Sequence, residues 1–455
     1  MRAFAPGGPR RKLNPARIIL LGFLAVIFTG ALLLMTPAAS RGGAPADFLT
    51  ALFTSTSAAC VTGLVVTDTA LAWSGFGQAV ILLIIQIGGL GIMSISVIFY
   101  FVMRKKIGLS HRILLVKSLD LRDMQGVVRL MRHVLLGTLI FESAGAAVLW
   151  ARFARTFGLW KALWLGVFHS VSAFCNAGFD LMGGVGAPFS SLAACSDDPV
   201  IIIVILLLVM IGGLGFFVWE DVWRNKGLRK LRVHSKIVLA ATFWLLIIGW
   251  ITLFFTERSN PGTIGGMPFG KAALASLFQA VMPRSGGFSI VDQSALTGAS
   301  RMIVVMLMII GGSSGSTSGG IKNATFCILF LSAIRSLRGK NRLVIFGRTI
   351  PPRQIITAAT ILTMFMTACI SGTLLISLLQ PEIPFSGVLF DTVSAIAICG
   401  LAHGVPQILT AFPRIILILL MFFGRVGIMT FGMAAFLNRN AEDKMKNPDS
   451  WILIG

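Results

Sequence analysis

The chain has 455 residues, of which 56% are hydrophobic and only 12% are charged. A soluble protein of this length would form roughly three domains, and so few polar residues could not cover the surface of those domains. The composition therefore excludes a soluble globular protein and indicates an integral membrane protein. The net charge of +22 needs no nucleic acid, because basic loops on the cytoplasmic side, in contact with anionic membrane lipid, account for it.

Eight apolar segments are long enough to cross about 30 Å of hydrocarbon at about 1.5 Å per residue. They are residues 18–36, 78–103, 133–150, 199–219, 237–255, 302–334, 354–379 and 415–437. The first resembles a signal peptide, but it has no convincing cleavage site, and we expect a retained helix. Four shorter apolar segments, of about 12 to 14 residues each, suit re-entrant or interfacial helices better than crossings. These are residues 48–59, 161–174, 270–282 and 385–398.

Lysine and arginine predict the orientation of the chain in the membrane. Residues 104–132 hold eight basic side chains, residues 224–236 hold six, residues 335–353 hold six, and more precede the first crossing. Because basic loops stay on the cytoplasmic side, both termini are predicted to be cytoplasmic. The chain is therefore expected to be a multi-pass protein of the cell membrane.

The sequence contains a fourfold internal repeat. Each short apolar segment ends in a turn with a glycine, namely Gly63, Gly178, Gly287 and Gly400, at separations of 115, 109 and 113 residues. A second glycine follows each of these, at Gly88, Gly212, Gly311 and Gly424. The repeat predicts four tandem units of helix, half-membrane helix, glycine loop and returning helix.

A glycine loop at membrane depth exposes peptide groups that lipid cannot satisfy, so it must line a cavity filled with water or ions. Four such loops can surround one axis and replace the water of a dehydrated cation with backbone carbonyls. Glycine suits a backbone that needs left-handed dihedrals, although a single glycine in such a segment is more often a packing residue. The predicted fold is therefore all-α, with the four units arranged pseudo-fourfold around a central ion pore. The predicted boundaries are a cytoplasmic N-terminal segment 1–16, units 17–110, 111–232, 233–345 and 346–438, and a cytoplasmic C-terminal tail 439–455.

The motifs ACVTGLVVTD, HSVSAFCNAGFDLM, RSGGFS and GGSSGSTSGGIK resemble those of the Trk/Ktr/HKT superfamily of potassium transporters, and of the membrane subunit of bacterial Ktr systems in particular. The resemblance runs from about Arg17 to Leu437. It implies K⁺ transport through one four-unit pore, a homodimer of such pores, and regulation by a cytoplasmic ring of nucleotide-binding RCK subunits. Na⁺ is a possible modulator, and no other cofactor is implied.

The resemblance also assigns the residues of the K⁺ selectivity filter, whose backbone oxygens would hold the ion. They are Val61, Thr62, Gly63, Asn176, Ala177, Gly178, Ser285, Gly286, Gly287, Ile398, Cys399 and Gly400. Glycine rather than serine at position 63 points to K⁺ over Na⁺. The fourth loop departs from the family pattern at Cys399, Ala402 and His403.

The resemblance assigns a gate role to the polar segment that interrupts the crossing 302–334. This gate loop comprises Gly311, Gly312, Ser313, Ser314, Gly315, Ser316, Thr317, Ser318, Gly319 and Gly320. Its hydroxyl groups can satisfy freed backbone groups locally. Arg425 is expected near the cavity, either as an electrostatic barrier that contacts the gate loop or as a donor to helix carbonyls, and Lys322 either belongs to the same site or snorkels to the inner face. The spacing does not fit a phosphate-binding P-loop, because Ile321 separates Gly320 from Lys322 and Asn323 follows.

The remaining polar residues give little support for enzyme chemistry. The five histidines lack metal-ligand spacing, His169 is expected to cap or orient a short helix, and the six cysteines form no CxxC pair. Asp68, Asp180 and Asp292 follow the first three glycine turns and would concentrate cations, cap helices or pair with Arg284.

Glu142 is either a buried structural acid or a protonatable site, which leaves open an ion-coupled symporter with alternating access. A membrane enzyme or scaffold is the third alternative, and it predicts no cation flux.

Overall fold

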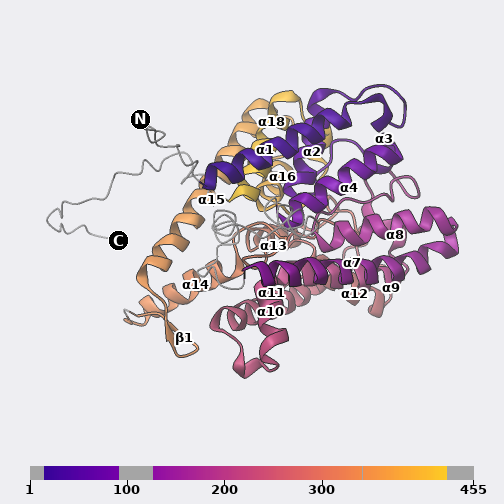
Figure 1. Ribbon diagram of the computed structural model, residues 1–455. Helices are drawn as coiled ribbons and strands as arrows, with labels where there is room; N and C mark the ends of the chain where they lie inside the picture. The colour runs from indigo at the N-terminus through magenta and orange to yellow at the C-terminus, as the bar shows by residue number, and fades with distance from the viewer. Residues whose placement is uncertain (1–14, 92–126, 341, 428–455) are drawn as a thin grey trace, which may run out of the picture.

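The computed structural model describes residues 15–91, 127–340 and 342–427. Figure 1 shows that nearly all of this chain is helical, with helices from distant parts of the sequence packed into one bundle. Several predicted features lie outside the described residues: the basic N-terminus, most of the loop 104–132, the distal halves of the crossings 78–103 and 415–437, and the C-terminal tail.

Four helices of the described chain are long and apolar enough to cross a membrane, or five if one bent pair counts as a single span. The four are α1 (Pro15–Leu34), α7 (Val127–Phe157), α11 (Val233–Glu257) and α15 (Pro352–Leu379). They coincide with the first predicted crossing of each unit. Their apolar side chains remain widely exposed on the outside of the bundle, as hydrocarbon surroundings require.

Each long helix is followed by a short helix and then by a second apolar helix. The short helices are α2 (Phe48–Cys60), α8 (Leu159–Phe174), α12 (Phe269–Val281) and α16 (Phe385–Ala397). Residues just before three of these helices favour a helix start at that point. Asp47 caps α2 by accepting hydrogen bonds from Leu49 N and Thr50 N, and a proline, Pro268 or Pro384, precedes α12 and α16. The second helices are α4 (Gly75–Leu90), α9 (Pro199–Leu214), α13 (Gly298–Ile309) and α18 (Ala411–Val426).

Helix α14 (Asn323–Leu337) continues the second crossing of the third unit. The remaining elements are shorter: α3 (Thr69–Ala72), α10 (Phe216–Asn225), α17 (Val405–Ile408), η1 (Pro37–Ala39), η2 (Ser191–Cys195), η3 (Leu228–Lys230) and the strands β1 (Val344–Ile345) and β2 (Arg348–Thr349). The two strands pair antiparallel, with Val344 opposite Thr349. In Figure 1 this hairpin lies beside α14 and α15, and Ile345 is buried against Ile237 of α11.

The crossing predicted over residues 199–219 is bent in the structure. After Leu214 the chain turns, and α10 lies at 89° to α9. The turn occurs at Gly215, whose φ is +90°, a backbone conformation that side chains with a Cβ rarely adopt. Apolar composition alone could not reveal this bend, because the apolar run continues past the turn through residues 216–219.

The crossing predicted over residues 302–334 is interrupted at its glycine-rich middle, as expected. Helix α13 ends at Ile309 and α14 begins at Asn323, and the chain between them forms a closed loop. Gly311 N donates to Ile321 O at 2.9 Å and Ile321 N donates to Ile309 O at 3.0 Å, which ties the two ends of the loop together. The loop can therefore extend inward while its ends stay aligned with α13 and α14.

The second glycine of three units allows a second helix to lie directly on a short helix. A Cβ added to Gly88, Gly212 or Gly424 would lie 2.1, 2.1 or 2.2 Å from a backbone carbonyl oxygen. Those carbonyls belong to Ala59, Phe174 and Ile396, each four residues before the glycine that follows the short helix. Packing, rather than special dihedrals, therefore explains these three glycines.

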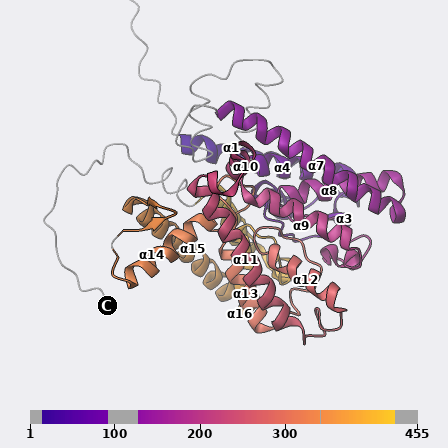
Figure 2. The same ribbon diagram turned by 90° about the horizontal axis from the view of Figure 1, so that it is seen from below.

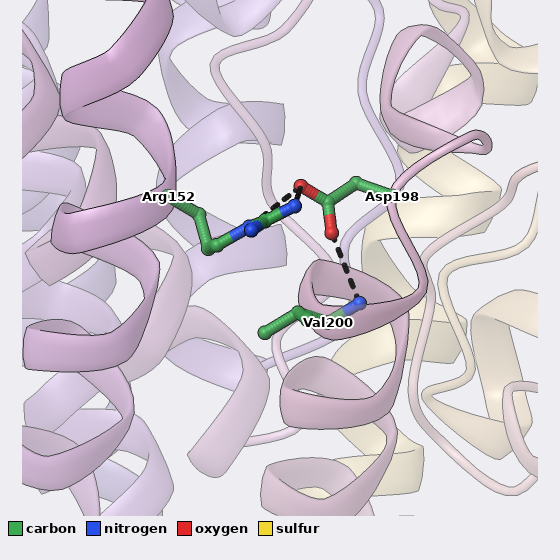
Figure 3. A network of polar contacts seen from close by, with 3 residues as sticks. All are labelled: Arg152, Asp198 and Val200. Carbon is green, nitrogen blue, oxygen red and sulfur yellow. Dashed lines mark hydrogen bonds and ion pairs between the residues drawn. The ribbon is translucent and has the colours of Figure 1, made fainter.

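Polar contacts tie the ends of the helices to each other as well. Figure 2 shows α7, α8 and α9 grouped on one side of the bundle and α11, α13 and α16 on another. Arg152 of α7 donates from Nε to Asp198 at 2.8 Å, and Asp198 also accepts a hydrogen bond from Val200 N at the start of α9 (Figure 3). One carboxylate thus caps α9 and joins it to α7.

Replacing Gly212 with Ala should destabilise the protein by about 1–3 kcal/mol, because the added methyl group meets the rigid Phe174 carbonyl. The measurement is the thermal unfolding midpoint of the purified protein in detergent. Gly270→Ala is the matched control, because a Cβ there meets nothing within 4 Å. Equal midpoints for the two variants would contradict the packing role of Gly212.

Candidate functional site

Four glycine loops follow the short helices: residues 61–63, 176–178, 285–287 and 398–400. All four repeat one backbone pattern. The first residue of each loop has a positive φ (Val61 60°, Asn176 59°, Ser285 71°, Ile398 56°), and so does the glycine (Gly63 89°, Gly178 69°, Gly287 74°, Gly400 92°). Left-handed dihedrals at a non-glycine residue cost on the order of 1–3 kcal/mol, most of all for β-branched side chains such as Val61 and Ile398. The repetition of this strain in four places indicates a shared structural requirement.

Serines of the short helices hold two of these loops in place. Thr62 N donates to Ser57 O at 2.7 Å, and Gly63 N donates to Ser57 Oγ at 3.1 Å. Ser394 makes the same two contacts in the fourth unit, with Cys399 N at 2.8 Å and Gly400 N at 3.1 Å. Because these hydrogen bonds satisfy the buried N–H groups, the carbonyl groups of the loops remain available to other partners.

Ser172 supports the second loop by a different route. Its carbonyl accepts a hydrogen bond from Ala177 N at 2.7 Å, while its hydroxyl donates to Phe179 O, also at 2.7 Å. His169 acts beside it: Nδ1 lies 2.8 Å from Leu165 O, and Nε2 accepts from Leu181 N at 3.3 Å. His169 therefore joins α8 to the chain that leaves the loop, whereas the sequence predicted that it caps or orients a short helix.

The four glycine loops contact one another in one cyclic order. A Cβ added to Gly63 would lie 2.4 Å from Ala177 O, and one added to Gly178 would lie 3.3 Å from Gly286 O. The same construction gives 2.9 Å from Gly287 to Cys399 O and 2.3 Å from Gly400 to Thr62 O. In every loop the carbonyl of the middle residue thus approaches the glycine of a neighbouring loop. The four middle carbonyls and the four glycines are packed around a common centre, where no further side chain fits.

A cavity of about 390 Å³ opens from these loops, and all four glycines line it. Asp68, Asp180 and Asp292 also line it. Each carboxylate accepts backbone hydrogen bonds: Asp68 from Ala70 N, Leu71 N and Phe189 N, Asp180 from Met182 N, and Asp292 from Ser294 N. Asp68 therefore caps α3, which is one of its predicted roles, and it also lines the cavity at the glycine loops.

Two side chains beside the cavity, Asp180 and His403, have pKa values that differ from their ordinary ones. The pKa of Asp180 is raised to about 6, mainly by burial and in smaller part by the neighbouring carboxylate of Asp68. Burial lowers the pKa of His403, and the positive charge of Arg301 acts in the same direction. At neutral pH the cavity therefore keeps a carboxylate at Asp180 and a neutral imidazole at His403.

Arg284 does not have the partner that the sequence suggested. Its guanidinium lies 3.4 Å from both Thr242 Oγ1 and Gly311 O, and no ion pair joins it to a carboxylate in the described part of the chain. Arg284 comes immediately before the third glycine loop, so it connects that loop to the start of residues 311–320. The position of Arg284 in the sequence could not show whether its guanidinium contacts the Gly311 carbonyl or a carboxylate.

The gate loop, residues 311–320, lies against the third and fourth glycine loops and against the end of α8. Thr317 Oγ1 donates to Phe174 O at 3.3 Å, and Gly319 N donates to Ser285 Oγ at 3.0 Å. A Cβ on Gly319 would lie 2.6 Å from Ala397 O. Ser313, Thr317 and Ser318 are buried, so the polar side chains of this segment face the protein rather than lipid.

Arg425 binds the gate loop to the first unit. Its guanidinium donates to Thr317 O at 2.6 Å and to Gly89 O at 3.2 Å, and also to Gly88 O. Both expected contacts, with the gate loop and with helix carbonyls, are therefore present. Lys322 donates from Nζ to Ser318 O at 2.6 Å, so its side chain turns back to the gate loop rather than toward the inner face.

Glu142 of α7 lies in a buried polar cluster behind the second glycine loop. Gln86 Nε2 donates to its Oε2 at 3.1 Å, and the thiol of Cys175 lies 3.8 Å from its Oε1. Gln86 and Cys175 were not singled out in the sequence, because only the packing of α4 against α8 brings them to Glu142. In the described part of the chain, all six cysteines are free and no group of three or more His, Cys, Asp or Glu side chains could hold a metal ion.

The apolar helices and the ring of backbone carbonyls define a multi-pass membrane protein built around a polar centre. Residues 9–442 match the protein-family model for TrkH, described as a cation transport protein. The chain belongs to this family of cation transport proteins.

Individual relatives share almost the whole chain. It is 38% identical to the potassium/sodium uptake protein NtpJ of Enterococcus hirae, over 98% of each chain. It is 35% identical to the Ktr system potassium uptake protein B of Bacillus subtilis, over 98% of this chain and 97% of that protein. The crystal structure of the potassium transporter TrkH from Vibrio parahaemolyticus has the same fold, with a TM-score of 0.75, 16% identity and coverage of 94% of this chain and 86% of that one.

Replacing Ser57 or Ser394 with Ala should lower stability by about 1–3 kcal/mol each, because a buried glycine N–H then loses its hydroxyl partner. Thermal unfolding in detergent measures the loss. Thr360→Ala is the control, since it also removes a hydroxyl from a helix but at an exposed position. If both serine variants unfold at the control's temperature, the hydroxyl groups do not support the loops.

Proposed function

We propose that this protein takes up K⁺ through a gated, channel-like pore of four pseudo-fourfold units, with the glycine loops as its selectivity filter. The observation that carries the proposal is the cyclic contact between the middle carbonyls, Thr62, Ala177, Gly286 and Cys399, and the four glycines. Backbone oxygens gathered around one centre can replace the hydration shell of a K⁺ ion. The filter then comprises the twelve residues of the glycine loops.

Relatives support potassium as the substrate. Two similar proteins are named as potassium or potassium/sodium uptake proteins. Glycine at position 63, where the backbone is left-handed and closely packed, agrees with a filter that excludes a Cβ. Na⁺ is then a modulator or a second, poorer substrate.

The cavity at the filter acts as the outer vestibule in this proposal. The carboxylates of Asp68, Asp180 and Asp292 line it and give it a negative potential, which raises the local concentration of cations. Both termini are then cytoplasmic and the cell membrane is the site of action. Transport down the electrochemical gradient needs no coupling acid, and Glu142 keeps a structural role.

The gate loop is the second part of the proposal. Residues 311–320 contact the third and fourth filter loops and the end of α8, and Arg425 and Lys322 place positive charge beside them. These charges temper cation occupancy, and movement of the flexible loop clears the path. Similar proteins are named as parts of a Ktr system, which supports a partner subunit, proposed here as a cytoplasmic RCK-type nucleotide-binding ring that regulates the pore. A homodimer of this chain is the unit proposed to bind that ring.

Gly63→Ser should reduce the preference for K⁺ over Na⁺ by at least tenfold, because the new side chain would overlap Ala177 O, which lies 2.4 Å from the Cβ position. Uptake of K⁺, Rb⁺ and Na⁺ into liposomes containing the purified protein measures the preference. Gly75→Ser is the control, since nothing lies within 4 Å of its Cβ position. The absence of any cation flux for the unaltered protein would reject transport, and unchanged selectivity in Gly63→Ser would reject this filter.

Deletion of residues 313–318 should raise K⁺ uptake several-fold in the absence of any partner protein, because the chain beneath the filter is removed. Arg425→Gln should act in the same direction by releasing Thr317 O. Initial rates of ⁸⁶Rb⁺ uptake into liposomes provide the test. Rates equal to those of the unaltered protein in both variants would show that the loop does not obstruct the pore.

A further inference from the structure

Helix α10 connects the gate loop to a basic surface of the protein. At its start, Phe216 N donates to Gly315 O at 2.9 Å. The ring of Phe217 lies against Gly315 so closely that a Cβ there would be 2.4 Å from Cε2. Just before α10, Gly213 O accepts a hydrogen bond from Ser313 N at 3.0 Å. Displacement of α10 would therefore act directly on the gate loop.

The other end of α10 carries a turn, residues 223–232, that we call the basic turn. It is fastened by Asp221, whose buried carboxylate accepts hydrogen bonds from Arg232 N at 2.9 Å and from Asn225 Nδ2 at 2.6 Å. Lys236 of α11 holds it from the other side by donating to Arg229 O at 2.8 Å. Because these contacts fix the basic turn to α10, the two segments should move together.

The exposed surface of the basic turn combines apolar and cationic side chains. Trp223 is 85% exposed and Leu228 is 75% exposed. Between and after them stand exposed cations: Arg224, Lys226, Arg229, Lys230 and Arg232. The acid nearest in sequence, Asp221, is buried beneath the turn and lies 3.9 Å from Arg232 Nε, and the preceding Glu220 is half-buried. The other four cations keep the outer face of the turn positive. Phe346 of the hairpin, 57% exposed, lies next to this surface, with Lys236 Nζ 6.0 Å from its ring centre.

This combination matches the chemistry of a membrane surface better than that of water. Exposed tryptophan and leucine gain stability from the headgroup region and the adjacent hydrocarbon, while lysine and arginine reach the phosphates. Anionic lipids of the cytoplasmic leaflet attract each nearby basic residue. A large exposed indole among five cations has no comparable partner in bulk solvent.

We propose that the basic turn binds the headgroups of anionic phospholipids in the cytoplasmic leaflet and that α10 transmits this binding to the gate loop. The attraction draws the turn toward the membrane surface, and α10 then pulls Phe216 and Phe217 away from Gly315. Anionic lipid thereby favours the conducting state. The lipid site stands on its own, whereas its effect on transport rests on the function proposed above.

Lipid binding is tested first. Native mass spectrometry of the full-length protein in detergent compares retention of added phosphatidylglycerol with that of phosphatidylcholine. We expect the protein to prefer phosphatidylglycerol and the triple variant R224Q/R229Q/K230Q to bind it at least tenfold more weakly. The triple variant R338Q/K340Q/R353Q, which removes equal charge from another basic connection, should stay within twofold of the unaltered protein. Unchanged binding in the first variant would overturn the proposal and leave the surface to an acidic soluble partner.

The coupling is tested by ⁸⁶Rb⁺ uptake into liposomes of phosphatidylcholine alone and with about one-third phosphatidylglycerol. Uptake by the unaltered protein should rise at least threefold with the anionic lipid, and R224Q/R229Q/K230Q should lose this response. Phe217→Ala should keep phosphatidylglycerol binding but lose the response, because its contact with Gly315 is removed. Equal uptake in both lipids would overturn the coupling, whereas no uptake in either would reject the proposed transport and leave the binding result intact.

Discussion

The fold depends on one constraint: four stretches of irregular backbone lie among apolar helices, where unsatisfied peptide groups are costly. The glycine loops meet it by directing their N–H groups into the protein, to Ser57, Ser172 and Ser394, and by leaving their carbonyls at the common centre. Paired left-handed residues in each loop make this possible. The strain at Val61 and Ile398 persists because the packed surroundings hold both in place.

A second set of glycines supports the glycine loops from the surrounding helices. Gly88, Gly212 and Gly424 let α4, α9 and α18 rest on the final carbonyls of the short helices, so each loop is supported from behind by backbone rather than by flexible side chains. The third unit departs from this pattern, since Gly311 packs against Gly319 within the gate loop. The third unit instead provides the segment that packs against the third and fourth glycine loops.

Much of the architecture could be predicted because its signals are local. Runs of apolar residues located the long helices, and repeated glycines located the four loops. The bend at Gly215 could not be predicted, because GGLG also occurs in ordinary helix contacts. Residues 61, 285 and 398 gave no local sign of a positive φ, since neither valine, serine nor isoleucine favours it. The contacts of Arg284 and the cluster of Glu142 with Gln86 join residues tens of positions apart, which single-sequence patterns do not encode.

The sequence by itself determined the membrane as solvent, the fourfold repeat and the position of each glycine loop, because hydropathy and backbone freedom are properties of short segments. The tertiary structure decided the cyclic order of the loops, the carbonyls that face the centre and the partners of Arg425 and Lys322. These depend on distances between separate units. A ring of backbone oxygens exists only when four units pack together, and no one unit contains the information for the gap it shares with the next.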